Sequence, residues 1–300
     1  MNIALCTDDK YAFPCGVCIT SILENNKDEV CNIYILTEGL APKSIEKFRN
    51  LERAYSQTIT IITIDSKDFD ELKVSARFPK SIYFRFLLPK LIKGESKILY
   101  LDCDIIVTKE LKELWNTDIS NYACGVIEDQ RSDDIRVQNN IELYDTYFNS
   151  GVLLMNLEYW RENDIAKQLT DFIYNNAEKC EFPDQDALNY VLYKKVLYLD
   201  YTYNYQELML LAPYDSFLHK SKWHKLLGGN ETPAIIHYNG WIKPWILTCT
   251  HKFKSEFLKY KENSPWKKEK LKPRYTFIQK IMLIRRITLN ILWNKGHCIE

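Results

Sequence analysis

Short apolar runs alternate with helical patterns over the first part of the chain, and this alternation constrains the fold more than any other feature. Runs rich in aliphatic residues lie at 2–6, 31–37 and 59–64, and each has the length of a buried strand. Between them, residues 13–23 and 44–54 have the character of helices, the second following a proline. This order predicts a parallel sheet with helices packed on its faces.

The later part of the chain continues the pattern. Residues 81–92 and 157–175 are expected to be helical, and residues 123–127, 147–156 and 234–236 are expected to be strands. With 46% hydrophobic and 13% aromatic residues, 300 residues supply a core for one large α/β domain or two small ones. No charge-free apolar stretch reaches the roughly 18 residues that a membrane span requires.

Charge and cysteine content predict a partner surface and a cellular compartment for the protein. The formal net charge is zero, but residues 265–300 carry nine lysines and arginines against two glutamates, which predicts an anionic surface as partner for this segment. The nine cysteines indicate buried thiols and a reducing compartment rather than a disulfide framework. The N-terminus lacks the basic and apolar regions of a signal peptide, so a cytoplasmic location is expected.

Asp102 and Asp104 interrupt an apolar run that extends from Lys97 to Val107. In an extended strand, side chains two positions apart project to the same side, so the two carboxylates are expected to point together. Adjacent buried carboxylates repel each other unless a cation or a proton compensates. Oxygen ligands suit Mg²⁺ and Mn²⁺, so the pair predicts a metal site, and an acidic pair that caps a turn is the alternative.

Other polar residues stand where strands end or helices begin, which is the ligand-binding edge of a parallel sheet. Asp8 and Tyr11 follow the first strand and suit either a nucleobase or an ordinary polar loop. The Pro-Asp-Gln-Asp segment at 183–186 offers groups for sugar hydroxyls, although proline and acids also begin ordinary helices. The Asn-Ser-Gly turn signal at 149–151 lies inside a strand pattern, which predicts close approach of the backbone to a ligand.

His237 directly follows the short strand expected at residues 234–236. A single histidine in this position is either a structural side chain or, together with the carboxylate pair, a third ligand for Mn²⁺. The next loop contains Gly240 and Lys243, which offer close backbone approach and a cation for a phosphate group.

Together these motifs resemble glycosyltransferase family 8, the retaining sugar-nucleotide transferases that include bacterial lipopolysaccharide core galactosyl- and glucosyltransferases. The resemblance extends over roughly residues 1–260. Its motifs, in chain order, are Asp8 with Tyr11, Arg85, Leu-Asp-Cys-Asp at 101–104, Phe-Asn-Ser-Gly-Val-Leu-Leu-Met-Asn-Leu at 148–157, Asp-Gln-Asp at 184–186 and His-Tyr-Asn-Gly-Trp-Ile-Lys-Pro-Trp at 237–245. The resemblance implies a GT-A fold, one α/β domain with a mostly parallel central sheet flanked by helices.

The same resemblance implies roles for single residues. It implies that Asp102, Asp104 and His237 bind Mn²⁺, with Mg²⁺ as an alternative. For a UDP-sugar, Asp8 and Tyr11 are expected to contact uracil. Gly240 and Lys243 are expected to contact the diphosphate. The contacts to the donor sugar are expected from Arg85, Asn149, Asp184 and Gln185, and Ser150 is a further residue expected to bind the donor.

The implied reaction moves galactose or glucose from UDP-galactose or UDP-glucose to a hydroxyl of a saccharide, with lipopolysaccharide or lipooligosaccharide core as the expected acceptor. Gln185 and Asp184 are the catalytic candidates. Because Gln185 is an amide and a poor nucleophile, the hypothesis is front-face attack by the acceptor hydroxyl, with the departing phosphate as base. In this hypothesis Gln185 stabilises the oxocarbenium ion, and a covalent intermediate on Asp184 is the alternative.

Two other functions fit part of the sequence. The Asp-Cys-Asp motif after an apolar strand also resembles the nucleophile motif of haloacid-dehalogenase-type phosphatases. That family has threonine where this chain has Ile106, and it begins its domain with the strand that here lies about a hundred residues into the chain. The second alternative is a non-catalytic module that binds sugar nucleotides. A nucleic-acid partner is not expected.

The chain is expected to divide into a GT-A domain at 1–262 and a basic amphipathic tail at 263–300. Lysines and arginines interrupt the apolar face of the tail, so it is expected to lie in the interface of an anionic membrane. A helix docked on the domain is the alternative. Acceptor choice is expected to depend on residues 204–231. We therefore expect a peripheral enzyme on the inner face of the cytoplasmic membrane, where a glycolipid or oligosaccharide acceptor is presented.

Overall fold

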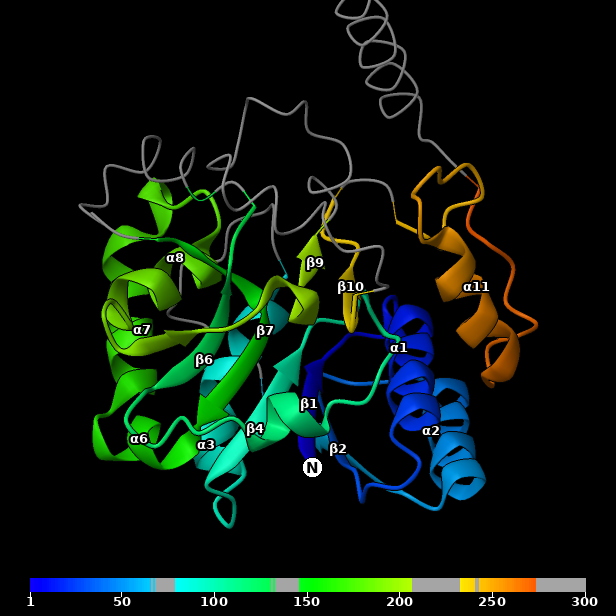
Figure 1. Ribbon diagram of the computed structural model, residues 1–300, viewed down its shortest axis with the longest axis horizontal. Coiled ribbons are helices and arrows are strands. Elements are labelled where there is room, and N and C mark those ends of the chain that lie inside the picture. The colour runs from blue at the N-terminus through cyan, green and yellow to red at the C-terminus, as the bar shows by residue number, and fades with distance from the viewer. Residues whose placement is uncertain are drawn as a thin grey trace, which may run out of the picture.

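The computed structural model describes residues 1–65, 67, 79–130, 132, 146–206, 233–240 and 243–273. Helices cover both faces of a seven-stranded sheet, and a three-stranded sheet lies beside it (Figure 1). The predicted α/β class is confirmed.

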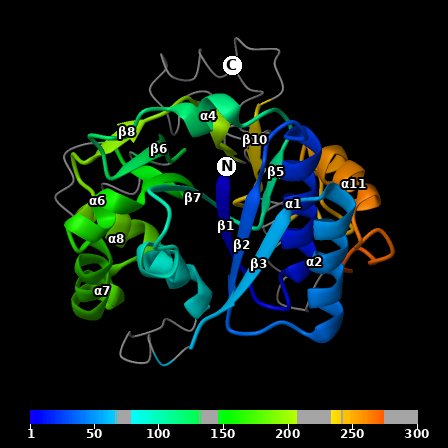
Figure 2. The ribbon, with the colours of Figure 1, turned by 90° about the horizontal axis from the view of Figure 1, so that it is seen from below.

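The first half of the large sheet forms as the alternation predicts. β1 (Asn2–Cys6), β2 (Asn32–Thr37) and β3 (Thr58–Thr63) are parallel neighbours in register. α1 (Ala12–Asn25) and α2 (Pro42–Tyr55) connect them and bury their apolar side chains on the same face of the sheet (Figure 2). This arrangement places the carboxyl ends of these strands at one edge.

Four further strands extend the sheet. β4 (Lys97–Leu101) is parallel to β1, and β7 (Phe148–Asn156) lies antiparallel between β4 and β6 (Cys124–Glu128). β8 (Val196–Tyr198) is parallel to β6. The order is β3-β2-β1-β4-β7-β6-β8. Within this sheet the pairings of β7 are antiparallel and the others are parallel, so the prediction of a mostly parallel central sheet is confirmed.

The apolar run around Asp102 and Asp104 is not one strand. β5 (Ile105–Val107) leaves the large sheet and pairs antiparallel with β10 (Ile235–His237), which also pairs with β9 (Tyr205–Gln206). The expectation of a single interrupted strand is therefore wrong, because the two acids lie in a turn between two sheets. Periodicity does not reveal the change of sheet, since both halves of the run are apolar and buried.

The expected helix at residues 81–92 is mostly a 3₁₀-helix. η2 (Lys80–Leu87) continues into a single α-helical turn, α3 (Leu88–Leu91). The aromatic residues of η2 pack in the core on the sheet face opposite α1 and α2. The expected helical segment is therefore present, although mostly with 3₁₀ geometry, and it buries Arg85, which is 3% exposed.

The expected helix at residues 157–175 is divided in two. α6 (Leu157–Glu162) ends before Asp164, and α7 (Ile165–Asn176) follows it. Asp164 has a left-handed backbone with φ of 48°, a conformation that interrupts a right-handed helix.

α8 (Pro183–Val191) lies with α6 and α7 on the second face of the sheet (Figure 2). The two faces enclose separate cores, because successive strand residues point to opposite sides: Ile3 belongs to the core beneath α1, and Ala4 to the core beneath α8. Further short helical turns are α4 (Lys112–Asn116), η3 (Ala177–Lys179) and η4 (Tyr201–Tyr203).

The last described segment packs against the first helices. α11 (Lys254–Asn263) contacts α1, and the buried ring of Trp266 lies over Gly16 of α1, where any Cβ would stand 2.0 Å from the indole. The boundary at residues 262 and 263 stays a prediction, and the tail beyond Pro273 lies outside the described residues. Within the described ranges, every helix is too short or too polar to cross a bilayer.

Candidate active site

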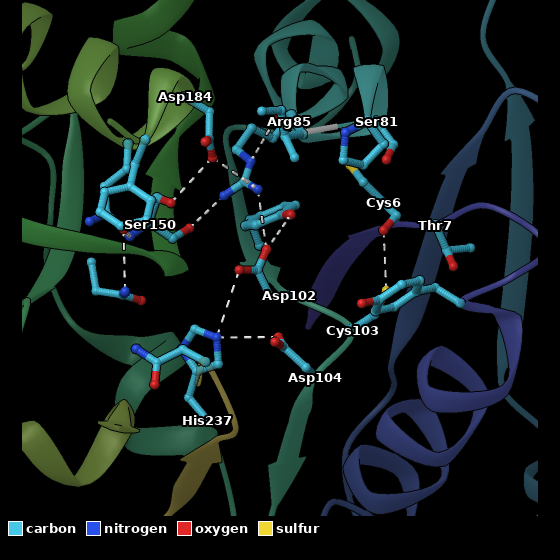
Figure 3. Close-up of a pocket in the computed structure, with 18 of the residues that line it drawn as sticks. Cys6, Thr7, Ser81, Arg85, Asp102, Cys103, Asp104, Ser150, Asp184 and His237 are labelled. Carbon is cyan, nitrogen blue, oxygen red and sulfur yellow. Dashed lines mark hydrogen bonds and ion pairs between the residues drawn. The ribbon is translucent and has the colours of Figure 1, made fainter. Parts of the chain in front are cut away.

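A cavity of about 380 Å³ lies where the carboxyl ends of β1 and β4 meet the first residues of β7 and the end of β10. All the site residues predicted from the sequence line it, except Gly240 and Lys243. Figure 3 shows Arg85, Asp102, Asp184 and His237 directed into this common space. The position agrees with the general rule that open α/β sheets bind ligands beyond the carboxyl ends of their strands.

Asp102, Asp104 and His237 converge on one part of the cavity wall (Figure 3). His237 Nε2 lies 3.2 Å from Asp104 Oδ1 and 3.8 Å from Asp102 Oδ2. The pairing of β10 with β5 causes this, because it places His237 opposite Ile105, the residue after Asp104. The two carboxylates therefore meet across a turn and not along a strand.

The three groups fit a divalent cation. One ligand atom from each residue lies within 4.8 Å of the others, and carboxylate oxygens with an imidazole nitrogen suit an ion such as Mn²⁺. Gly151 makes the approach of the imidazole possible, because a Cβ there would stand 2.2 Å from His237 Cε1 and 2.9 Å from Asp102 Oδ2. The close approach predicted at the Asn-Ser-Gly segment is thus an approach to the histidine ring.

Two cations compensate the carboxylates. Arg85 Nη2 lies 3.2 Å from Asp102 Oδ1, and Lys243 Nζ lies 2.6 Å from Asp104 Oδ2. Burial alone raises the pKa of Asp104, but Lys243 and His237 outweigh it and hold this pKa below its ordinary value. Asp104 therefore stays ionised, as a metal ligand must.

Arg85 also links the acids of β4 and α8. Its Nη1 donates to Ser150 O at 2.7 Å, and its Nη2 lies 3.3 Å from Asp184 Oδ2. Its guanidinium carbon lies 4.2 Å from the centre of the Tyr100 ring, so it is held on three sides. Burial raises the pKa of Asp184, and Arg85 reduces that effect.

The first turn of α8 meets the beginning of β7. Gln185 Oε1 accepts hydrogen bonds from Ser150 N at 2.9 Å and from Asn149 Nδ2 at 3.2 Å. Ser150 Oγ donates to Asp184 Oδ2 at 3.3 Å. These buried polar groups form a wall that presents amide and carboxylate groups to the cavity.

Asp129, which was not predicted from the sequence, lines the cavity and is 2% exposed. Its Oδ2 accepts hydrogen bonds from Asn149 Nδ2 at 3.0 Å and from Gln185 Nε2 at 3.3 Å. A signal was available, because Asp129 directly follows β6 and so stands at the ligand-binding edge. A second missed residue, Asn204, has no comparable signal in the sequence.

The remaining predicted residues lie at the rim or outside the cavity lining. Tyr11 N donates to Asp8 Oδ1 at 2.8 Å, which closes the loop after β1. The Tyr11 ring is 42% exposed and meets Trp245 edge to face, with centroids 5.7 Å apart. Gly240 lies in the loop after β10 next to Asn239, which lines the cavity, but Gly240 is not itself a lining residue.

The chain is similar to proteins of one family over most of its length. The profile of the family described as "Glycosyl transferase family 8" matches residues 2–249. General stress protein A of Bacillus subtilis (strain 168) is 28% identical over 274 residues, which cover 89% of this chain and 94% of that protein. Lipopolysaccharide glucosyltransferase WaaO of Escherichia coli (strain K12) is 30% identical over 280 residues, which cover 89% of this chain and 79% of WaaO.

Solved structures include a similar enzyme with bound ligands. The galactosyltransferase LgtC, crystallised with donor and acceptor sugar analogs, superposes with a TM-score of 0.79 and 26% identity. The superposition covers 88% of this chain and 96% of LgtC.

Proposed function

The chain belongs to glycosyltransferase family 8, and we propose that it transfers galactose or glucose from a UDP-sugar to a hydroxyl group of a saccharide. One observation supports this most directly: the Asp102–Asp104–His237 group and the wall formed by Asn149 and Gln185 share one cavity. A sugar nucleotide needs both, since its diphosphate requires positive charge and its sugar requires hydrogen-bonding groups. Membership of this family favours a transferase over the phosphatase considered from the sequence.

The donor is proposed to lie along the cavity from the β1 loop to α8. Asp8 and Tyr11 would hold uracil, and Gly240 with Lys243 would hold the diphosphate. The residues that would face the sugar are Arg85, Asn149, Ser150, Asp184 and Gln185, together with Asp129.

Asp102, Asp104 and His237 would hold Mn²⁺, or Mg²⁺ in its place. When bound, the ion neutralises negative charge on the diphosphate. Lys243, which pairs with Asp104, would also offset charge on the leaving UDP. Arg85, which contacts both Asp102 and Asp184, would hold the two carboxylates in position beside the sugar.

Retention is proposed to occur by front-face attack. Gln185 is a poor nucleophile because it is an amide, and its Oε1 already accepts two hydrogen bonds. Its proposed role is to stabilise the positive charge that develops on the sugar ring, while the departing phosphate takes the proton of the acceptor hydroxyl. Asp184, the alternative nucleophile, is engaged by Arg85 and Ser150.

The acceptor is proposed to be a lipopolysaccharide or lipooligosaccharide core. The support is the family relationship to WaaO, whose name describes a lipopolysaccharide glucosyltransferase. The basic tail at residues 263–300 is proposed to bind an anionic membrane surface, which would place a peripheral enzyme beside such an acceptor on the inner face of the cytoplasmic membrane.

A panel of UDP-sugars, scored for UDP release with and without Mn²⁺, tests the proposal. We expect Mn²⁺-dependent UDP release from UDP-galactose or UDP-glucose. Phosphate release from p-nitrophenyl phosphate with Mg²⁺, without UDP release, would indicate a phosphatase. Binding of a UDP-sugar with neither reaction would indicate a binding module.

A further inference from the structure

Asn204 is a fully buried amide that joins the candidate metal site to the proposed sugar site. Its Oδ1 lies 2.9 Å from His237 Nδ1, and its Nδ2 donates to Asn149 Oδ1 at 2.9 Å. We infer that Asn204 is a positioning residue, which fixes the tautomer of His237 and couples it to the amides of the sugar site. This inference rests on the proposed function, because it assumes that His237 binds a metal ion.

The direction of each hydrogen bond can be assigned because two of the groups involved can only donate or only accept. Gly151 N can only donate, and it donates to Asn149 Oδ1 at 3.0 Å. At the other end of the same amide, the Asp129 carboxylate can only accept, and it accepts from Asn149 Nδ2 at 3.0 Å. The orientation of Asn149 is therefore determined from both ends.

The orientation of Asn149 determines that of Asn204. Since Asn149 presents an oxygen to Asn204, Asn204 must present its Nδ2, and its Oδ1 then faces His237. A neutral His237 thus carries its proton on Nδ1 and leaves Nε2 with a free lone pair. That lone pair faces Asp104 Oδ1 at 3.2 Å, the arrangement that a bound cation requires.

The same bonds continue into the sugar site. Asn149 Nδ2 also reaches Gln185 Oε1 at 3.2 Å, and Gln185 Nε2 donates to Asp129 Oδ2 at 3.3 Å. One series of hydrogen bonds therefore runs from the imidazole of His237 through Asn204 and Asn149 to Asp129. Asn204 can hold this place because its backbone is fixed between η4 and β9, where its N–H donates to Tyr201 O at 3.1 Å.

The two bonds of Asn204 can be tested separately. Asn204→Ala removes both, whereas Asn204→Asp keeps an acceptor for His237 Nδ1 and removes the donor to Asn149. Asn26→Ala is the matched control, because Asn26 is also buried, its amide bonds Ile22 O and Leu111 N, and none of these residues lines the cavity. Melting temperatures of all variants report their folding.

The readout is Mn²⁺ binding by the full chain, measured from the electron paramagnetic resonance signal of free Mn²⁺ with and without UDP. We expect Asn204→Ala to weaken Mn²⁺ binding about 10- to 100-fold, as loss of a partner behind a metal-binding histidine does. Asn204→Asp should bind Mn²⁺ close to the wild-type level but lower kcat, because the sugar-site amides lose their link to His237. Asn26→Ala should lower only the melting temperature.

The outcomes separate this inference from the function on which it rests. Equal Mn²⁺ binding by Asn204→Ala and a wild-type chain that does bind Mn²⁺ would overturn the inference alone. An Asn204→Asp variant that loses Mn²⁺ as completely as Asn204→Ala would overturn the tautomer argument. A wild-type chain that binds no Mn²⁺ under either condition would overturn the metal part of the proposed function and this inference with it.

Discussion

Asp104 interacts with two groups of the candidate metal site. It faces the imidazole of His237 with one oxygen and the ammonium of Lys243 with the other. Lys243 Nζ also donates to Tyr238 O at 2.6 Å, so its position depends on the carboxylate and on one carbonyl. Because the charges of Asp104 and Lys243 compensate each other, removing one of them is expected to affect both metal binding and the stability of the fold.

Asp104→Asn is expected to abolish Mn²⁺-dependent UDP release and to lower the melting temperature, because the buried ammonium of Lys243 loses its charged partner. Asp28→Asn, in the exposed α1–β2 loop, is the matched control. UDP release and thermal unfolding measure the two effects. A variant that retains more than about a tenth of the wild-type rate, about 1.4 kcal/mol of barrier, would contradict the ligand assignment.

Gln185→Ala tests the mechanism at the sugar. Loss of one electrostatic contact should slow transfer by an amount worth a few kcal/mol or less, on the order of 10²- to 10³-fold. Loss of a nucleophile would be far more severe, on the order of 10⁶-fold. Single-turnover rates measure the effect, and mass spectrometry of the quenched reaction checks for an adduct. A glycosyl adduct on Asp184 or Gln185 would disprove front-face attack.

At the scale of elements, α8 is anchored to β7 by an acid that does not line the cavity. Asp186 is fully buried, and its carboxylate accepts hydrogen bonds from Tyr147 OH and from Phe182 N. These bonds hold the first turn of α8, which carries Asp184 and Gln185. Burial raises the pKa of Asp186 to about 6, and the nearby Asp184 adds to the shift.

This pKa predicts a pH-dependent stability. The folded chain binds the Asp186 proton more tightly than the unfolded chain, so the stabilisation is complete below the ordinary aspartate pKa and is lost as the pH rises through about 6. Urea unfolding measures this effect. When the pH is raised from 5 to 7.5, the free energy of unfolding of the wild type should fall by about 1 kcal/mol more than that of Asp186→Asn. Identical pH profiles for the two proteins would show that Asp186 titrates normally.

At the scale of the whole molecule, the described structure extends past the end of the family match. Trp266 is 2% exposed, and its ring centroid lies 5.0 Å from that of Phe48 on α2. Lys272 continues the attachment, since its N–H donates to Trp245 O at 2.8 Å. The segment up to Pro273 is thus held by the core of the domain.

A truncation after Pro273 is therefore expected to remain folded and to release UDP, but to lose sedimentation with anionic liposomes at low salt. Each basic residue near an anionic leaflet contributes about 1 kcal/mol, so three of them change partitioning roughly a hundredfold. The control is Trp266→Ala in the full chain. This variant should bind liposomes normally, but its free energy of unfolding should be about 3–5 kcal/mol lower than that of the wild type. A full-length chain that ignores the liposomes would show that the tail has another role.

The sequence by itself determined the class of fold and most of the candidate site. β1, β2, β3 and β7 could be predicted because each is a local run of apolar residues with strand spacing. Asp102 and Asp104 could be proposed as a pair from their spacing, and the resemblance to glycosyltransferase family 8 implied His237 as the third member of the group.

Only the tertiary structure decided how those residues meet. β5 joins β10 rather than continuing β4, because its backbone groups find partners more than a hundred residues away. Asn204 bonds His237 and Asn149 across separations of 33 and 55 residues, and Asp129 bonds Gln185 across 56. Local patterns record which side chains are buried, but the partner of a buried polar group is set by packing, and in this site that packing orients the histidine.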